Sequence, residues 1–211
     1  MPPRADLRLI VITDKGLATP RNVIDVVGAA LQAGAPAIQL RDKSASAREL
    51  LAQALQLRAL TRQHDVLLFI NDRIDVALAA QADGVHLGPD DIPLAAARQA
   101  VPANFLLGVS TDHPEQAAQA QREGADYIGC GAVFGTTSKD VGGEAIGVAR
   151  LEQVVHAVGI PVVGIGGVDT ANVAQVAATG AAGVAVIGAV MKAADVAAAV
   201  QSLLSPFTRP R

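Results

Sequence analysis

The sequence predicts a (β/α)8 barrel, or TIM barrel, in which eight parallel strands alternate with eight helices. Along the whole chain, short runs rich in β-branched residues alternate with longer Ala/Leu/Gln stretches at helical spacing. The strand runs are apolar throughout, as expected for parallel strands that are buried on both faces. Divided into eight units, the 211 residues give about 26 residues per unit, at the short end for this fold. We therefore expect a single α/β domain over residues 1–211, with terminal tails at about 1–6 and 205–211.

Each predicted strand is a short apolar run bounded by turn residues. The eight strands are Leu7–Thr13, Ala37–Arg41, Leu67–Asn71, Gly84–Gly88, Leu106–Ser110, Tyr127–Val133, Val162–Gly166 and Gly183–Ile187. The helices predicted after them are Arg21–Ala33, Ala47–Gln63, Ile74–Gln81, Ile92–Val101, Pro114–Glu123, Val148–Val158, Thr170–Thr179 and Ala193–Leu204. Glycine follows four of these helices, at positions 34, 124, 159 and 180, which is typical of helix C-terminal caps.

Two other architectures fit the pattern less well. An open doubly wound sheet requires a nucleotide-binding motif at its switch point. The nearest match, at 164–169, has Asp169 where the last glycine of G-x-G-x-x-G should stand, and G-x-x-x-x-G-K-[ST] does not occur. The uncharged run Thr170–Met191 is long enough to span a membrane. However, Asn172 and Gln175 interrupt it, and Thr179-Gly180 predicts a turn in its middle.

The composition indicates which binding partners and which cellular compartment to expect for this protein. The net charge of −3 and the aromatic content of 2% argue against nucleic acid and anionic membranes as partners. The first apolar run, Leu9–Thr13, is too short for a signal sequence. The single cysteine, Cys130, cannot form an intramolecular disulfide. We expect a cytoplasmic protein with small-molecule partners, and the sequence leaves open whether it forms a homo-oligomer.

Polar residues gather after the C-terminal ends of the predicted strands, where barrel enzymes build their active sites. The N-terminal ends carry mostly glycine, alanine and apolar residues, and this asymmetry indicates an enzyme. Gln39, Arg41 and Lys43 alternate at the end of the second strand, so an extended backbone points all three to the same side. Two cations beside an amide suit a phosphate or diphosphate ester. A solvated strand end is the alternative interpretation.

Asp72 and Asp91 follow neighbouring predicted strands. Two carboxylates close to cations, without a cluster of His or Cys, indicate a Mg²⁺ site rather than zinc or iron. The alternatives are an ion pair of Asp72 with Arg73, and Asp91 as the N-cap of a helix that begins at Ile92. His86 falls inside a predicted strand, where we expect a packed, hydrogen-bonded side chain rather than a catalyst.

Two further segments suit phosphate groups. The stretch 135–147 is long for a connection between strand and helix and carries glycines, hydroxyl residues and one lysine. Such a loop could order over a ligand as a lid, and the alternative is a solvent-exposed loop. Gly166-Gly167 and Ile187-Gly188 follow the seventh and eighth strands, where barrels commonly bind phosphate through backbone N–H groups. Simple turn chemistry is the alternative there.

Taken together, these motifs resemble those of the thiamine phosphate synthase family. The matching segments, in chain order, are QLRDK at 39–43, INDR at 70–73, ADGVHLG at 82–88, GVS at 108–110, GADYIG at 124–129, TTSK at 136–139 and IGG at 165–167. The resemblance covers nearly the whole chain and implies a (β/α)8 barrel. It also implies a Mg²⁺-dependent transferase that joins an aminopyrimidine methyl diphosphate to a thiazole phosphate and releases pyrophosphate.

The resemblance assigns the site residues by motif. The pyrimidine diphosphate would contact Gln39, Leu40, Arg41, Asp42, Lys43, Asn71, Ser110 and Lys139. The thiazole phosphate would contact Thr136, Thr137, Ser138, Gly167, Ile187 and Gly188. Mg²⁺ would bind Asp72 and Asp91, and the implied catalytic residues are Arg41, Lys43, Ser110 and Lys139.

Three positions depart from the usual pattern of the family. Pro89 stands where Gln is usual, Ser138 replaces a Thr, and Gly188 replaces a Ser. We expect these changes to affect the affinity for the thiazole phosphate more than the reaction itself. Three other functions remain as alternatives: a thiazole tautomerase on the same barrel, another phosphate-binding barrel enzyme, and a non-catalytic paralogue that binds the product. A tautomerase would not need a diphosphate site with two carboxylates and three cations, and another barrel enzyme would not share the motifs on the second to sixth strands. Intact Asp72, Asp91 and Lys139 argue against the non-catalytic paralogue.

Overall fold

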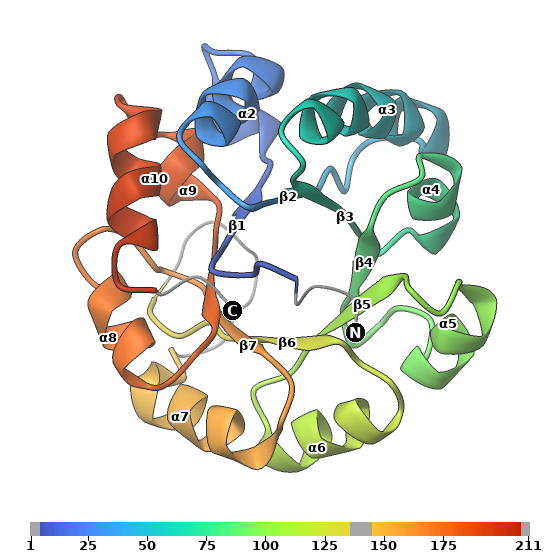
Figure 1. The fold of residues 1–211 in the computed structure, drawn as a ribbon, viewed down its shortest axis with the longest axis vertical. Helices are drawn as coiled ribbons and strands as arrows, with labels where there is room; N and C mark the ends of the chain where they lie inside the picture. The colour runs from blue at the N-terminus through green and yellow to red at the C-terminus, as the bar shows by residue number, and fades with distance from the viewer. Residues whose placement is uncertain (1–4, 136–144, 208–211) are drawn as a thin grey trace.

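A computed structural model describes residues 5–135 and 145–207, and within them eight parallel strands close into a barrel in chain order (Figure 1). The strands are β1 (Leu9–Ile12), β2 (Ala37–Leu40), β3 (Leu67–Asn71), β4 (Gly84–Leu87), β5 (Leu106–Ser110), β6 (Tyr127–Cys130), β7 (Val162–Ile165) and β8 (Gly183–Val186). The ring closes because β1 pairs with both β2 and β8, with Val11 opposite Ile38 and Val186. The predicted fold class is confirmed.

Helices form the outer ring of the barrel (Figure 1). They are α1 (Lys15–Ala18), α2 (Val23–Gln32), α3 (Ala47–Gln63), α4 (Ile74–Ala79), α5 (Leu94–Ala100), α6 (Pro114–Arg122), α7 (Gly147–Ala157), α8 (Val173–Ala178), α9 (Gly188–Met191) and α10 (Val196–Leu204). The eight predicted helices are present, most of them a few residues shorter than expected. The sequence did not predict α1 and α9, because four residues are too few to show a helical period.

Helix boundaries follow local chemistry. Ser46 begins α3 with a capping box, in which its hydroxyl accepts from the Glu49 N–H and Glu49 accepts from the Ser46 N–H. Three of the four glycines predicted as C-terminal caps have φ between 82° and 97°. The prediction for Gly159 was wrong, because α7 ends at Ala157 and the next residue is extended, so a left-handed residue is not needed there.

Inside the barrel, glycines leave space for three ring-bearing side chains from other strands. Tyr127 fills the space that a side chain at position 108 would take, and His86 does the same at position 129. Phe69 lies against the glycine at position 84 and meets the Tyr127 ring edge-on, with ring centroids 5.4 Å apart. These rings fill the barrel below the C-terminal ends of the strands and leave a cavity of about 10 Å³.

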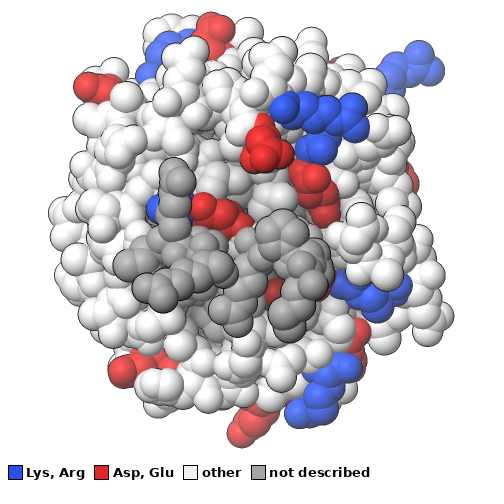
Figure 2. All heavy atoms as spheres, in the orientation of Figure 1, with Lys and Arg blue, Asp and Glu red and all other residues white. Residues whose placement is uncertain are grey.

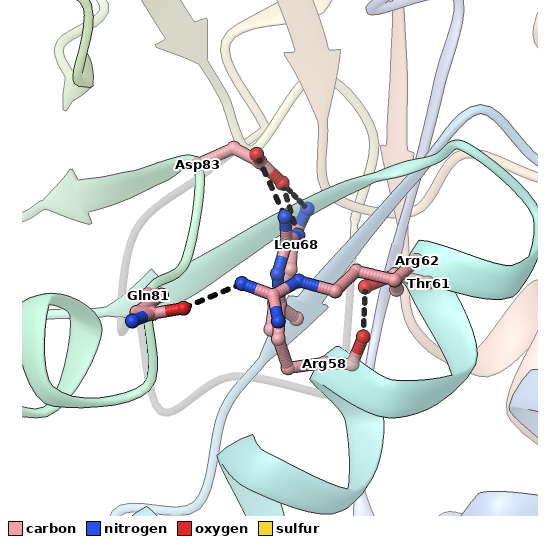
Figure 3. Close-up of polar contacts among 6 residues, drawn as sticks. All are labelled: Arg58, Thr61, Arg62, Leu68, Gln81 and Asp83. Carbon is pink, nitrogen blue, oxygen red and sulfur yellow. Dashed lines mark hydrogen bonds and ion pairs between the residues drawn. The ribbon is translucent and has the colours of Figure 1, made fainter.

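Ion pairs tie the opposite, N-terminal end of the barrel together. Just before β4, the Asp83 carboxylate accepts from the Arg58 guanidinium at 2.6 Å and from the Leu68 N–H at 2.7 Å (Figure 3). Just before β6, Asp126 makes the same two kinds of contact, with Arg98 and the Leu107 N–H. Each carboxylate therefore joins a helix to the start of two adjacent strands.

Acidic and basic side chains are interspersed on the surface. On the face drawn in Figure 2, acidic side chains lie near the middle as well as at the edge, and the basic side chains drawn do not gather into one patch. Among the residues that the structure describes, no helix is long and apolar enough to cross a membrane.

Candidate active site

The second strand delivers Gln39 into the barrel. Gln39 is 3% exposed and lines the interior cavity together with His86 and Tyr127. Within residues 5–135 and 145–207, its side-chain amide has no hydrogen-bond partner in this protein. The amide faces the cavity with its hydrogen-bonding groups unused, so this side chain is suited to bind a ligand at the mouth. Leu40 is fully buried, and the next residue on this strand with the same orientation as Gln39 is Arg41.

Thr13 fixes the backbone that carries these residues. Its N–H donates to the Gln39 carbonyl at 2.9 Å, and its hydroxyl oxygen accepts from the Arg41 N–H at 3.0 Å. Thr13 is itself 2% exposed, so both contacts are shielded from water. Thr13 was not among the predicted site residues, although it is a hydroxyl residue at the end of the first strand, like those predicted after the other strands.

Asp72 and Asp91 come together at the C-terminal ends of β3 and β4. The pKa of Asp72 is raised above its ordinary value, first by burial and then by the carboxyl group of Asp91, which lies within hydrogen-bonding distance. Lys43 acts in the opposite direction, with its Nζ 3.6 Å from Asp72 Oδ2. Asp72 also has φ of 63°, a left-handed conformation that is unfavourable for residues other than glycine. Backbone strain of this kind concentrates at functional sites.

The structure removes both alternative interpretations of these carboxylates. Arg73 pairs with Asp75, at 2.6 Å, rather than with Asp72. The helix predicted to begin at Ile92 begins at Leu94, so Asp91 is not its N-cap. Instead, Asp91 Oδ2 accepts from the Gly88 N–H at 2.7 Å, which orients the carboxylate toward the mouth residue Asp72.

Asp42 has a different environment from its neighbours. Its carboxylate accepts from the N–H groups of Ser44 and Ala45, the Ser44 hydroxyl and the Gln53 amide. Burial alone would raise the pKa of Asp42, but these hydrogen bonds outweigh it and hold the pKa below its ordinary value. The side chain thus anchors the loop before α3, and a contact between Asp42 and substrate stays a prediction.

Ser110, at the end of β5, belongs to a partly buried chain of polar side chains. Its Oγ lies 2.8 Å from His86 Nε2, and His86 Nδ1 lies 3.0 Å from the Tyr127 hydroxyl. The prediction that His86 is packed and hydrogen-bonded is confirmed. Its contact with Ser110 was missed, because only the register between β4 and β5 brings the two side chains together.

The phosphate-binding glycines lie after β7 and β8. Gly167 has φ of 64°, and a side chain there would meet the Gly135 carbonyl, so a substitution is excluded on both grounds. The Asn172 amide donates to the Gly167 carbonyl at 2.8 Å, a contact that the sequence analysis did not predict. Ile187 and Gly188 form the start of α9, whose first N–H groups have no acceptor within the helix.

The remaining predicted site residues are Asn71 and four residues of the segment after β6. Asn71 ends β3 and is partly exposed, next to Asp72. Thr136, Thr137, Ser138 and Lys139 lie outside the described residues. Within the described part of the chain, no group of three or more His, Cys, Asp and Glu side chains could hold a metal ion by itself. A cation at Asp72 and Asp91 would therefore take its other ligands from water or substrate.

Comparisons with known proteins place this chain among relatives of one activity. A family model described as thiamine monophosphate synthase matches residues 9–190. The chain is 48% identical over 198 residues to a thiamine-phosphate synthase of Chloroflexus aurantiacus, which covers 94% of this chain and 91% of that protein. It is 45% identical over 209 residues to a thiamine-phosphate synthase of Moorella thermoacetica, covering 99% of both.

A solved structure gives the same result. Thiamine phosphate pyrophosphorylase from Pyrococcus furiosus superposes with a TM-score of 0.87 and 45% sequence identity, covering 96% of each chain. Agreement in sequence extends over nearly the full length of these proteins, including both ends of the barrel. The chain therefore belongs to the thiamine monophosphate synthase family.

Proposed function

We propose that the mouth of this barrel joins 4-amino-2-methyl-5-hydroxymethylpyrimidine diphosphate to 4-methyl-5-(2-hydroxyethyl)thiazole phosphate, giving thiamine monophosphate and pyrophosphate. Membership of the family gives the general activity, which is that of a transferase that forms thiamine phosphate. The observation that carries the proposal is the pair of carboxyl groups at Asp72 and Asp91, adjacent to the Lys43 ammonium. Diphosphate binding and release require this combination of a cation site and basic side chains.

The carboxylate pair fits Mg²⁺. In proteins this ion is bound through one or two carboxylates, with water and substrate phosphate oxygens as its remaining ligands. Two carboxylates at hydrogen-bonding distance repel each other, and a bound cation removes that repulsion. Asp72 and Asp91 would hold the ion, and when bound it would supply positive charge for the diphosphate group.

The chain's own side chains stabilise the departing group and orient the substrate. The bond between the pyrimidine methylene carbon and the diphosphate oxygen breaks, and its electron pair leaves with pyrophosphate. Arg41, Lys43 and Lys139 would neutralise the charge that grows on that group. The thiazole nitrogen then forms the new bond to carbon. A side-chain nucleophile is not needed, which agrees with the burial of Cys130 and its raised pKa of about 12, caused chiefly by burial.

Backbone N–H groups at positions 167, 187 and 188 would bind the thiazole phosphate. Asn172 supports this role, because its hydrogen bond to the Gly167 carbonyl fixes the orientation of that peptide. Gly188 removes a side-chain hydroxyl from the usual family pattern but leaves its N–H available at the start of α9. We also infer a single-domain cytoplasmic enzyme, which the buried free thiol of Cys130 supports.

The test is a coupling assay with the purified protein, both phosphorylated precursors and Mg²⁺. Thiamine phosphate is oxidised to its fluorescent product and quantified. We expect product in the presence of Mg²⁺ and its loss on addition of a chelator, with recovery when Mg²⁺ is restored. A folded protein that forms no product from both precursors would contradict the synthase function. Product formation that resists the chelator would contradict the metal site alone.

A further inference from the structure

A chain of three polar side chains runs from the barrel interior to the mouth. Tyr127 on β6 is 1% exposed, and its hydroxyl lies 3.0 Å from Nδ1 of His86 on β4. The other ring nitrogen of His86, Nε2, lies 2.8 Å from Oγ of Ser110 on β5. The proposed function uses Ser110 at the substrate but assigns no role to the two residues behind it.

The packing holds both rings in place. A side chain at position 108 would overlap the Tyr127 ring, and a Cβ at position 129 would lie 2.8 Å from His86 Cε1. Phe69 meets the Tyr127 ring edge-on, at an interplanar angle of 67°. The two rings therefore fill space that glycines leave for them.

The direction of the hydrogen bonds follows from Tyr127. Burial raises the pKa of Tyr127, so its hydroxyl keeps its proton. Within residues 5–135 and 145–207, the hydroxyl has one hydrogen-bond partner, His86 Nδ1. Because a buried donor left unpaired is costly, the hydroxyl donates to Nδ1. A neutral imidazole that accepts at Nδ1 carries its proton on Nε2 and donates it to Ser110 Oγ.

We propose that His86 and Tyr127 are positioning residues that present the Ser110 hydroxyl as a hydrogen-bond donor to an acceptor atom of the bound pyrimidine diphosphate. Since Ser110 Oγ already accepts from His86, its own proton is directed to the ligand. Hydrogen bonds in such a chain polarise one another, which makes the last hydroxyl a better donor. The inference rests on the proposed function, which places Ser110 at the substrate.

Two substitutions of His86 separate its nitrogen atoms. His86→Gln retains an N–H donor near the position of Nε2, whereas His86→Asn retains a polar group near Nδ1 only. We expect kcat/KM for the pyrimidine diphosphate to fall by about tenfold in His86→Asn and by less than about threefold in His86→Gln. Tyr127→Phe removes one oxygen and keeps the ring packing, and we expect an intermediate loss. Equal losses in the Gln and Asn variants would contradict the proposal.

A double-mutant cycle with Ser110→Ala tests whether His86 acts through Ser110. We expect His86→Asn to lower kcat/KM about tenfold in the parent chain and less than about twofold when Ser110 is already alanine. A loss of the same size in both backgrounds would show an independent or purely structural role. Ile10→Val is the matched control, because Ile10 lines the same cavity and has no polar atoms to lose. We expect its kcat/KM to stay within about twofold of the parent value.

NMR of the unmodified protein tests the hydrogen-bond direction without any activity measurement. Two-bond ¹⁵N–¹H correlation spectra near neutral pH are expected to show His86 as a neutral imidazole with its proton on Nε2. A proton on Nδ1 would overturn the proposal. Absence of thiamine phosphate from the unmodified protein would overturn the proposed function instead, while the spectrum still decides how His86 and Tyr127 are bonded.

Discussion

Two aspartates at opposite ends of the barrel have opposite surroundings. Asp83, before β4, accepts from the Arg58 guanidinium at 2.6 Å and from the Leu68 N–H at 2.7 Å. Asp72, after β3, has a lysine Nζ at 3.6 Å, a second carboxyl group within hydrogen-bonding distance and a left-handed backbone. This chain satisfies the charge of Asp83 by itself, but it leaves the charge of Asp72 in conflict with a neighbour. The difference separates a carboxylate that stabilises the fold from one held for a ligand.

The contrast is a property of the two ends rather than of single residues. Asp126 repeats the contacts of Asp83 two units further along the barrel, with Arg98 and a strand N–H as its partners. At the mouth, Gln39 is buried without a hydrogen-bond partner among the described residues. The carboxylates of Asp83 and Asp126 at the N-terminal end are thus paired within the chain, although Arg58 Nε beside Asp83 has no hydrogen-bond partner among the described residues. At the C-terminal end, the Gln39 amide has none.

Removing the charge at the mouth should have the largest effect. Asp72→Asn keeps a residue type that tolerates a left-handed backbone but removes a ligand of the proposed cation. We expect kcat to fall by about 100- to 1000-fold, and the same for Asp72→Ala and Lys139→Ala, while the fold stays intact. The coupling assay and a thermal melt measure the two quantities. Asp75→Asn, in an exposed ion pair nearby, is the control and should retain near-parental turnover. Near-normal activity of Asp72→Asn would remove Asp72 from the mechanism.

Removing the charge at the N-terminal end should affect stability instead. In Asp83→Ala, the half-buried Arg58 loses its partner and the Leu68 N–H loses its acceptor. We expect the free energy of unfolding to fall by about 3 kcal/mol, with kcat little changed below the melting transition. Urea unfolding measures the change, and Asp75→Ala in the exposed pair should cost less than about 0.5 kcal/mol. A variant as stable as the parent would show that the contrast between the two ends is not energetic.

A change inside the barrel tests the region between the two ends. Gly108→Ala places a Cβ where the Tyr127 ring lies, so the ring must move. We expect a loss of about 2 kcal/mol in the free energy of unfolding from this overpacking. Gly28→Ala is the matched control, because nothing lies within 4 Å of the added Cβ on α2. We expect the free energy of unfolding of Gly28→Ala to rise by up to about 1 kcal/mol, because alanine has the higher helix propensity. The two substitutions should therefore change stability in opposite directions.

The fold could be predicted from the sequence because each strand and each long helix shows its own hydrophobic pattern. Apolar runs mark the strands, and α3 keeps its inward side chains, Leu50, Ala54, Leu57 and Thr61, three or four residues apart. Four-residue helices such as α1 carry no such signal. Its start is set by Asp14, whose carboxylate accepts from the Leu17 N–H, a cap that is visible only once the turn is known.

The candidate site was predictable where single strands determine it. Alternation at the end of β2 pointed to Gln39 and Arg41, and strand order brought Asp72 and Asp91 to neighbouring positions. Contacts that depend on register between strands could not be read from the sequence. His86 meets Ser110 because β4 and β5 pair with His86 opposite position 108, two residues before the serine. A shift of one residue in the register of β4 would point the His86 ring out of the barrel.

Substitution of Asp42 should have the smallest effect on stability and activity. This residue lies at the mouth, as Asp72 does, but its hydrogen bonds are satisfied within the chain, as those of Asp83 are. Its carboxylate accepts four hydrogen bonds from its own loop and from Gln53. We expect Asp42→Ala to lower the free energy of unfolding by about 1 kcal/mol, and kcat/KM by less than about tenfold. Urea unfolding and the coupling assay measure the two quantities.

The pH dependence of that loss has a fixed sign. Hydrogen bonds hold the pKa of Asp42 below its ordinary value despite burial, so the folded chain binds this proton less readily than the unfolded chain. The stabilisation is therefore present above the ordinary pKa of an aspartate and is lost as the pH falls through the lowered pKa. Asp42→Ala should differ most from the parent at neutral pH and converge with it in acid, as urea unfolding at both conditions would show. A loss of turnover as large as that of Asp72→Asn would instead place Asp42 among the residues held for a ligand, so satisfied hydrogen bonds alone would not distinguish the two ends of the barrel.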